Sequence, residues 1–386
     1  MRDRLNAAVY TTKRSAIREF SALARATPGC VSLTLGEPDF DTPLPVRDAA
    51  WDALCSHETH YIENNGARAL RERIAAYEHD KNGMDYTADE VIVTAGATEA
   101  RFVALFGILN PGDEVIIPTP AFVLYEEIVK LCRGVPVFLD TAPDGFQIDA
   151  ARLSALVTPR TKAILLNSPN NPTGCVYDAE SLAAVQSIAA ERPLFVICDD
   201  VYRQLFYGTE YHSFAEFRAL RDRLLLVQSF SKPYAMTGWR MGYLLADAPV
   251  KERLELLHQF MVVSTPAPFQ RAAIAALEYD PAPLVETYRR RRAYVLSRLD
   301  GMGLDYPEPL GAFYAFPSIR RFGLEDREFC TRLIRDGGLA VTPGACFGGP
   351  GHIRLSYCYG DAELKEGLDR LERFLEKLKQ EHGNAN

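Results

Sequence analysis

Lys232 lies between side chains that bind anions. Ser229 precedes it by three residues, and Arg240, in a Gly-Trp-Arg run, follows it by eight. A phosphorylated aldehyde held by that hydroxyl and that guanidinium would present its carbonyl carbon to the lysine amine, which is the arrangement of a pyridoxal phosphate Schiff base. A lysine in a loop of serine and glycine is otherwise a surface residue, and the Ser-x-Ser-Lys run alone favours that interpretation. The added spacing to Arg240 favours the Schiff base.

Two side chains that would tune such a cofactor follow an apolar run that ends at Cys198. A carboxylate at Asp199 would keep the pyridine ring protonated, and the phenol of Tyr202 would contact the ring hydroxyl. Asp200 is an alternative partner for the ring nitrogen, and an acid after a strand also caps helices. This motif by itself does not decide which of the two aspartates would pair with the ring nitrogen.

Three further runs place polar or aromatic groups after apolar strands. Ala97 and Thr98 stand where a strand passes into a helix, and backbone amides at such a point bind phosphate. Arg101, one turn further, is expected to be solvated. Phe122 would stack on the pyridine, although a phenylalanine is more often core. Asn171, in a turn-forming Asn-Pro-Thr-Gly run, would reach the cofactor hydroxyl and the substrate carboxylate.

Arg354 is a single arginine in an apolar strand that follows a glycine-rich approach. A guanidinium in this position suits two-pronged capture of a substrate carboxylate. An arginine in a small-domain strand is otherwise just as often exposed. Because Arg354 occurs together with the motifs above, we predict that it is a site residue.

The elements that must position these residues alternate between strands and helices. Short apolar runs separated by helical or turn-rich segments predict a mainly parallel sheet with helices on both faces. The seven predicted strands are 91–93, 114–117, 135–139, 163–166, 194–198, 224–227 and 242–245. After Pro281 and Pro283 the pattern changes to a long helix and short strands, which predicts a smaller α+β domain.

Composition excludes several other classes of protein. The chain has 386 residues, 47% of them hydrophobic, and a net charge of −8, which argues against nucleic acid or an anionic membrane as a partner. The run of four arginines at 289–292 is expected to be a solvated helix face. No apolar segment approaches the roughly 20 residues of a membrane span, and no secretory signal is evident, so we expect a cytoplasmic protein. Eight scattered cysteines suggest reduced thiols. His57 and His60 lack a third ligand, so no metal site is predicted.

Over nearly its whole length the chain resembles the fold-type I pyridoxal phosphate aminotransferases of the aspartate aminotransferase family. Within that family it looks most like the bacterial branch of N-acetyl-diaminopimelate and aromatic amino acid aminotransferases. The motifs that carry the resemblance are Gly36-Glu37-Pro38-Asp39-Phe40, His60-Tyr61, Gly96-Ala97-Thr98-Glu99-Ala100, Asn171-Pro172-Thr173-Gly174, Asp199-x-x-Tyr202, Ser229-x-Ser231-Lys232 through Arg240, and Ile353-Arg354-Leu355-Ser356. The expected fold is α/β, with a seven-stranded sheet sandwiched by helices in a large domain over 45–283. Both chain ends, 1–44 and 284–386, are expected to form the small α+β domain.

The resemblance also implies roles for the individual residues. Lys232 would carry the cofactor as a Schiff base and move protons, with Ser231 beside it among the cofactor-binding residues. Asp199 would pair with the pyridinium, while Tyr202 and Asn171 would contact the ring hydroxyl. These roles make pyridoxal 5′-phosphate the expected cofactor.

The remaining implied roles concern the substrate and a second subunit. Gly36 and Arg354 would receive the substrate's α-carboxylate. Tyr61 would reach the phosphate bound by the neighbouring subunit, so a homodimer is expected. The implied activity transfers the amino group of an L-amino acid to a 2-oxo acid, with 2-oxoglutarate the expected acceptor, in two half-reactions.

Two other functions remain open at this stage. A β-lyase could use the same fold and the same lysine to eliminate a side-chain thiol. A regulator that only senses the cofactor carries a DNA-binding segment ahead of such a domain, and Gly36 comes too early in this sequence to leave room for one.

Overall fold

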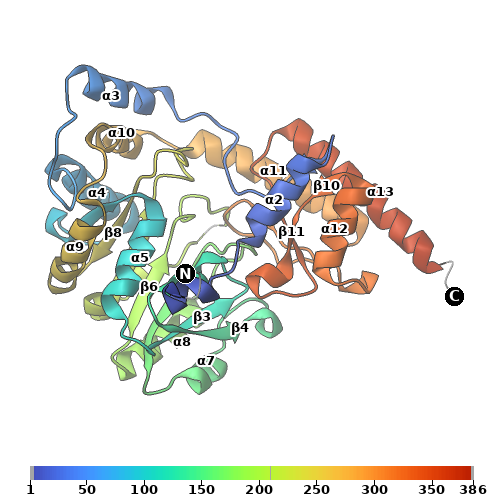
Figure 1. Cartoon of the computed structure of the whole chain (residues 1–386), viewed down its shortest axis with the longest axis horizontal. Helices are drawn as coiled ribbons and strands as arrows, with labels where there is room; N and C mark the ends of the chain where they lie inside the picture. Colours follow the sequence, from blue (N-terminus) through green and yellow to red (C-terminus); the bar gives the residue numbers. More distant parts are fainter. Residues whose placement is uncertain (1–3, 209, 384–386) are drawn as a thin grey trace.

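The computed structural model describes residues 4–208 and 210–383 and is organised around one seven-stranded sheet (Figure 1). The strand order is β2-β8-β7-β6-β5-β3-β4, and β8 is antiparallel to both of its neighbours while the other pairs are parallel. The strands are β2 (Val91–Thr94), β3 (Glu114–Thr119), β4 (Val135–Asp140), β5 (Thr161–Asn167), β6 (Phe195–Asp199), β7 (Leu224–Ser229) and β8 (Gly242–Ala246). The prediction of a mainly parallel, seven-stranded sheet is therefore confirmed.

Both faces of this sheet are buried, which explains why its strands read as continuous apolar runs. Side chains alternate between the faces along a strand, so Leu165 and Ile197 join one hydrophobic cluster while Ile164 and Val196 join the other. Helices α5 and α6 contribute to the first cluster, and α4, α8 and α10 contribute to the second. The sheet is thus the middle layer of three.

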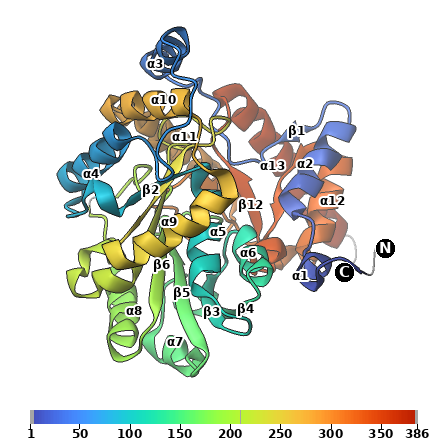
Figure 2. The same cartoon turned by 60° about the vertical axis from the view of Figure 1, so that its left-hand side comes forward.

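Helices cover the sheet on both sides, as Figures 1 and 2 show. Helix α3 packs on α10, which in turn packs on α4. The helices of this part of the chain are α3 (Leu44–Cys55), α4 (Arg68–Asn82), α5 (Gly96–Ile108), α6 (Leu124–Leu131), α7 (Ala150–Leu156), α8 (Ala179–Glu191), α9 (Ala248–Val262) and α10 (Ala267–Glu278). Among the residues described above, no helix is both long and apolar enough to cross a membrane.

The two ends of the chain meet in a second group of elements. Strand β1 pairs in parallel with β10, so that Val31 lies opposite Leu339, and β12 is the middle strand of a three-stranded antiparallel sheet with β11 and β9. Helix α2 contacts β10 and β11, and α13 packs on α11 and α12. These elements are α2 (Ala16–Ala26), β1 (Val31–Ser32), α11 (Ala282–Met302), β9 (Tyr314–Ala315), α12 (Asp326–Gly337), β10 (Leu339–Ala340), β11 (Thr342–Pro343), β12 (Ile353–Ser356) and α13 (Asp361–Gly383). The short helix α1 (Ala7–Thr11) instead contacts α6, beside the large sheet. The domain boundaries at 44/45 and 283/284 stay a prediction, and residues 1–3 and 384–386 of the predicted small domain lie outside the described residues.

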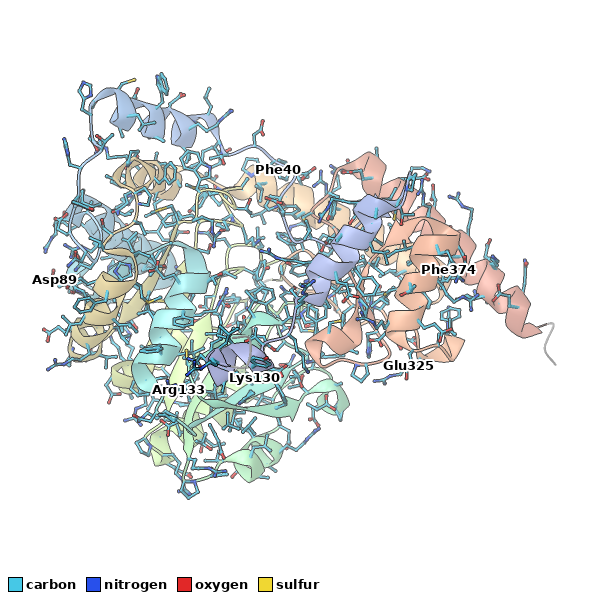
Figure 3. The ribbon with its side chains drawn as sticks, viewed as in Figure 1. Phe40, Asp89, Lys130, Arg133, Glu325 and Phe374 are labelled. Carbon is cyan, nitrogen blue, oxygen red and sulfur yellow. The ribbon has the colours of Figure 1, made fainter. Side chains whose placement is uncertain are left out.

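Helix α11 carries the four-arginine run, and one of its members is not solvated. Arg291 is 6% exposed, and its two terminal nitrogens each lie 2.7 Å from a carboxylate oxygen of Asp39, while its Nε lies 3.0 Å from Asp361. Its guanidinium also lies 5.4 Å from the ring centre of Phe40, which Figure 3 labels beside this helix. The expectation of a wholly solvated face was wrong for Arg291, which anchors the N-terminal segment that contains Asp39 and Phe40.

Candidate active site

A cavity of about 310 Å³ lies where the parallel strands of the large sheet end. Every predicted site residue except Tyr61 lines it. The strands β2, β3, β5, β6 and β7 each end at or just before one of these residues, because parallel strands direct their carboxyl ends to the same edge of a sheet. The opposite wall comes from the segment around Gly36 and from β12, which carries Arg354.

One end of the cavity is built to hold an anion. Helix α5 begins at Gly96, whose φ of +75° glycine adopts easily, and a Cβ on Gly96 would lie 2.6 Å from Nη2 of Arg240. The guanidinium is therefore packed against the first turn of α5, where the amides of Ala97 and Thr98 lie. Backbone amides at a helix N-terminus together with an arginine form a phosphate site.

Lys232 lies just past the end of β7 and follows Ser229 and Ser231 in the sequence. The hydroxyl of Ser229 accepts a hydrogen bond of 3.1 Å from the amide of Ser231, and Nζ of Lys232 donates one of 2.6 Å to the carbonyl of Gly36. Burial, together with the positive charges of Arg101 and Arg240, lowers the pKa of Lys232 from 10.5 to about 8. A lysine with such a pKa is neutral in about a tenth of molecules at pH 7, and the neutral amine is the nucleophile.

Asp199, at the end of β6, has one satisfied and one free carboxylate oxygen. It is 0% exposed; Oδ2 accepts hydrogen bonds from Tyr125 Oη at 2.5 Å and Arg101 Nε at 2.7 Å, while Oδ1 has no partner. A buried carboxylate oxygen is normally satisfied, so this one is suited to an N–H donor from a molecule in the cavity. The protonated ring nitrogen of pyridoxal phosphate is such a donor, and the set of donors and acceptors along the cavity fits that cofactor.

Asp200 points away from this cavity. Its carboxylate accepts a hydrogen bond of 3.1 Å from the hydroxyl of Ser213 and lies 3.7 Å from Nη1 of Arg203. Burial raises its pKa to about 7. Of the two aspartates that the sequence left open, only Asp199 lines the cavity.

Tyr202 makes its main polar contact with a residue that the motifs did not indicate. Its hydroxyl lies 2.8 Å from the hydroxyl of Tyr314, and burial raises the pKa of both phenols. A Cβ on Gly36 would clash with the hydroxyl of Tyr314, so a glycine is required where this segment crosses the cavity. The two phenols therefore form a hydrogen-bonded pair on the cavity wall.

The guanidinium of Arg354 is fixed by hydrogen bonds from both terminal nitrogens, whereas its third nitrogen has no partner. It is 1% exposed; Nη1 donates to Oδ1 of Asn171 at 2.9 Å, Nη2 donates to the carbonyl of Thr34, and Nε has no partner. The guanidinium also lies 4.6 Å from the ring centre of Tyr314 and 4.8 Å from that of Phe347. A fixed guanidinium with an unsatisfied N–H at the edge of a cavity suits a carboxylate ligand.

Tyr61 is the one predicted site residue that the structure does not bring to the cavity. Its side chain is 89% exposed, on the surface near Pro266. His57 and His60 are exposed as well. In the part of the chain that the structure describes, no three His, Cys, Asp or Glu side chains form a group able to hold a metal ion.

Sequence reasoning missed several residues that line the cavity, among them Arg101, Tyr125 and Tyr314. Arg101 was expected to be solvated, whereas it is 5% exposed and paired with Asp199. The available signal was its position between Ala100 and Phe102 in an otherwise apolar stretch of helix. Tyr125 and Tyr314 stood in apolar runs that gave no such signal.

Comparisons with known proteins agree with this geometry. The family described as "Aminotransferase class I and II" matches residues 28–371. The chain is 39% identical to the "Probable N-acetyl-LL-diaminopimelate aminotransferase" of Bacillus subtilis, over 97% of both chains, and 36% identical to the "Aromatic-amino-acid aminotransferase 2" of Thermococcus litoralis, over 95% and 96%. The solved structure of the aspartate aminotransferase of Thermus thermophilus with maleate superposes with a TM-score of 0.91 at 37% identity, over 96% of this chain and 99% of the other. The chain therefore belongs to the class I and II aminotransferases and shares their fold.

Proposed function

We propose that this aminotransferase uses pyridoxal 5′-phosphate bound to Lys232 to move the amino group of an L-amino acid to a 2-oxo acid. The observation that supports this most is one cavity that contains the amine of Lys232, the free oxygen of Asp199 and the guanidinium of Arg354. When bound, the cofactor supplies an aldehyde that condenses with amines and a protonated ring that accepts electrons.

The residues of the chain would then divide the remaining work. The first turn of α5, Ser229 and Arg240 bind the phosphate. Asp199 holds the proton on the ring nitrogen, and Phe122 covers one ring face. Lys232, with its lowered pKa, takes the α-proton of the amino acid and delivers it to C4′ of the cofactor, the other carbon bonded to the transferred nitrogen.

The substrate would be oriented by its α-carboxylate. Arg354, with Asn171 beside it, binds this group, which every amino donor and every 2-oxo acid acceptor shares. We propose 2-oxoglutarate as the acceptor, and the two half-reactions follow one another at the same site. Aromatic amino acids, aspartate and N-acetyl-diaminopimelate are the donors that the names of the relatives suggest for testing.

We further propose that the active unit is a homodimer in which Tyr61 serves the partner's cofactor. Its exposure in the single chain supports this, as do other exposed apolar side chains that a second subunit would cover, among them Trp51 and Phe260. The cytoplasm is the proposed location, and the free state of all eight cysteines supports it. The large domain is proposed to comprise 45–283, with 1–44 and 284–386 in the small one.

Borohydride reduction followed by peptide mapping tests the proposal. Wild-type protein loaded with pyridoxal phosphate should carry the label on Lys232, and Lys232→Ala should carry none. A label on another lysine contradicts the proposed site. A screen of amino acids then follows the loss of the cofactor's visible absorbance, and formation of pyruvate in place of glutamate would show a β-lyase.

A further inference from the structure

We infer that Arg101 is a positioning residue that keeps Asp199 ionised and turned so that one carboxylate oxygen remains free for the cofactor ring. The inference rests on the proposed function, because it concerns the partner of the ring nitrogen. It adds a residue outside the motifs on which that proposal was built.

The geometry holds Arg101 in one place. Its Nε lies 2.7 Å from Oδ2 of Asp199, and its guanidinium carbon lies 5.6 Å from the ring centres of both Phe122 and Tyr125. With 5% of the residue exposed and its Nε hydrogen-bonded to Asp199, the guanidinium is fixed beside this carboxylate on the cavity wall. Arg101 therefore acts on the cofactor site through Asp199.

The charge of Arg101 is what Asp199 requires. A fully buried carboxylate without a counter-charge takes up a proton instead of remaining ionised. Tyr125 donates a hydrogen bond to the same oxygen, Oδ2, but it is neutral and brings no charge. Because both donors act on Oδ2, Oδ1 is left free for the ring nitrogen of the cofactor.

Arg101 also affects Lys232, the proposed attachment point of the cofactor. Its positive charge is one of the causes that lower the pKa of Lys232, after burial and together with Arg240, whereas Cys358 and Glu37 raise it. The carbonyl of Gly36 is the hydrogen-bond acceptor at the same Nζ. Loss of the arginine should therefore raise the pH at which the nitrogen of Lys232 loses its proton.

Two substitutions separate charge from size. Arg101→Gln keeps a polar side chain of similar length without the charge, and Arg101→Lys keeps the charge without the flat guanidinium. Tyr125→Phe is the matched control, since it removes a hydrogen bond from the same carboxylate oxygen and leaves all charges in place.

The measurements are the dissociation constant of pyridoxal phosphate from the apoprotein and the pH midpoint of the visible absorbance of the loaded protein. Arg101→Gln should weaken cofactor binding roughly 10- to 100-fold and raise the midpoint by about one pH unit, which is the shift that a single charge about 12 Å away produces at an effective dielectric constant near 20. Arg101→Lys should keep the midpoint within about 0.3 of the wild-type value, and Tyr125→Phe should weaken binding less than about 10-fold without raising the midpoint.

The outcomes separate this inference from the proposed function. Wild-type protein that does not bind the cofactor on Lys232 contradicts the proposed function. Normal binding by wild type, with both quantities unchanged in a folded Arg101→Gln variant, contradicts the role of Arg101 alone. If Arg101→Gln does not fold, Arg101→Lys decides, because a midpoint raised by a full pH unit despite the retained charge overturns the inference.

Discussion

Replacing Arg354 with alanine should weaken amino donors and oxo-acid acceptors alike. The guanidinium is 1% exposed, so a substrate carboxylate placed there without it would be desolvated and unpaired. Such a loss costs about 2 to 5 kcal/mol. At about 1.36 kcal/mol for each factor of ten, kcat/KM should fall roughly 30- to 5,000-fold. Arg354→Lys should recover only part of this, because an ammonium group cannot make the two-pronged contact.

The assay is kcat/KM for a dicarboxylic, an aromatic and a neutral amino acid and for their oxo acids. Removing Arg354 also deprives Asn171 and the carbonyl of Thr34 of a donor, so thermal melting is measured for each variant. Phe347→Leu is a control, since it disturbs the packing of the guanidinium and leaves the charge. Losses confined to dicarboxylic substrates would refute the assignment, because Arg354 would then read the substrate's side chain.

Three further predictions concern the cofactor site. The rate at which the apoprotein captures pyridoxal phosphate should rise with pH, reach half its maximum near pH 8 and then level off, because only the neutral amine of Lys232 reacts. A rate that still rises at pH 10 would mean that the pKa of Lys232 is not lowered. Asp199→Asn should reduce turnover far more than it reduces the melting temperature, whereas Asp200→Asn should be mild in turnover, and the reverse order would exchange their roles. Mixed dimers of inactive Tyr61→Ala and Lys232→Ala chains should regain activity if Tyr61 serves the opposite subunit, and a fully active monomer would contradict this.

Local patterns predicted much of this structure. The strands of the large sheet were recognisable because burial on both faces leaves continuous apolar runs, and the residues just past their ends fell into one cavity because parallel strands share an edge. Arg101 could not be placed in the same way, because its partner Asp199 is 98 residues away and the pairing depends on how α5 lies against β6. Arg291 was misread for the same reason, since its partner Asp39 is 252 residues distant. A charge in an apolar stretch shows that a partner is needed and does not show which one.

The contact between Arg354 and Thr34 has a consequence for how the chain is made. The two residues are 320 positions apart, and β1, which ends just before Thr34, pairs with β10 near the other end of the chain. At about 5 to 20 residues per second, a ribosome needs roughly 15 to 65 s to synthesise that stretch. During this time β1 has no strand to pair with and the wall of the cavity that contains Arg354 does not exist. A nascent chain therefore cannot bind substrate, and its N-terminal strand stays open to wrong partners until synthesis is nearly complete.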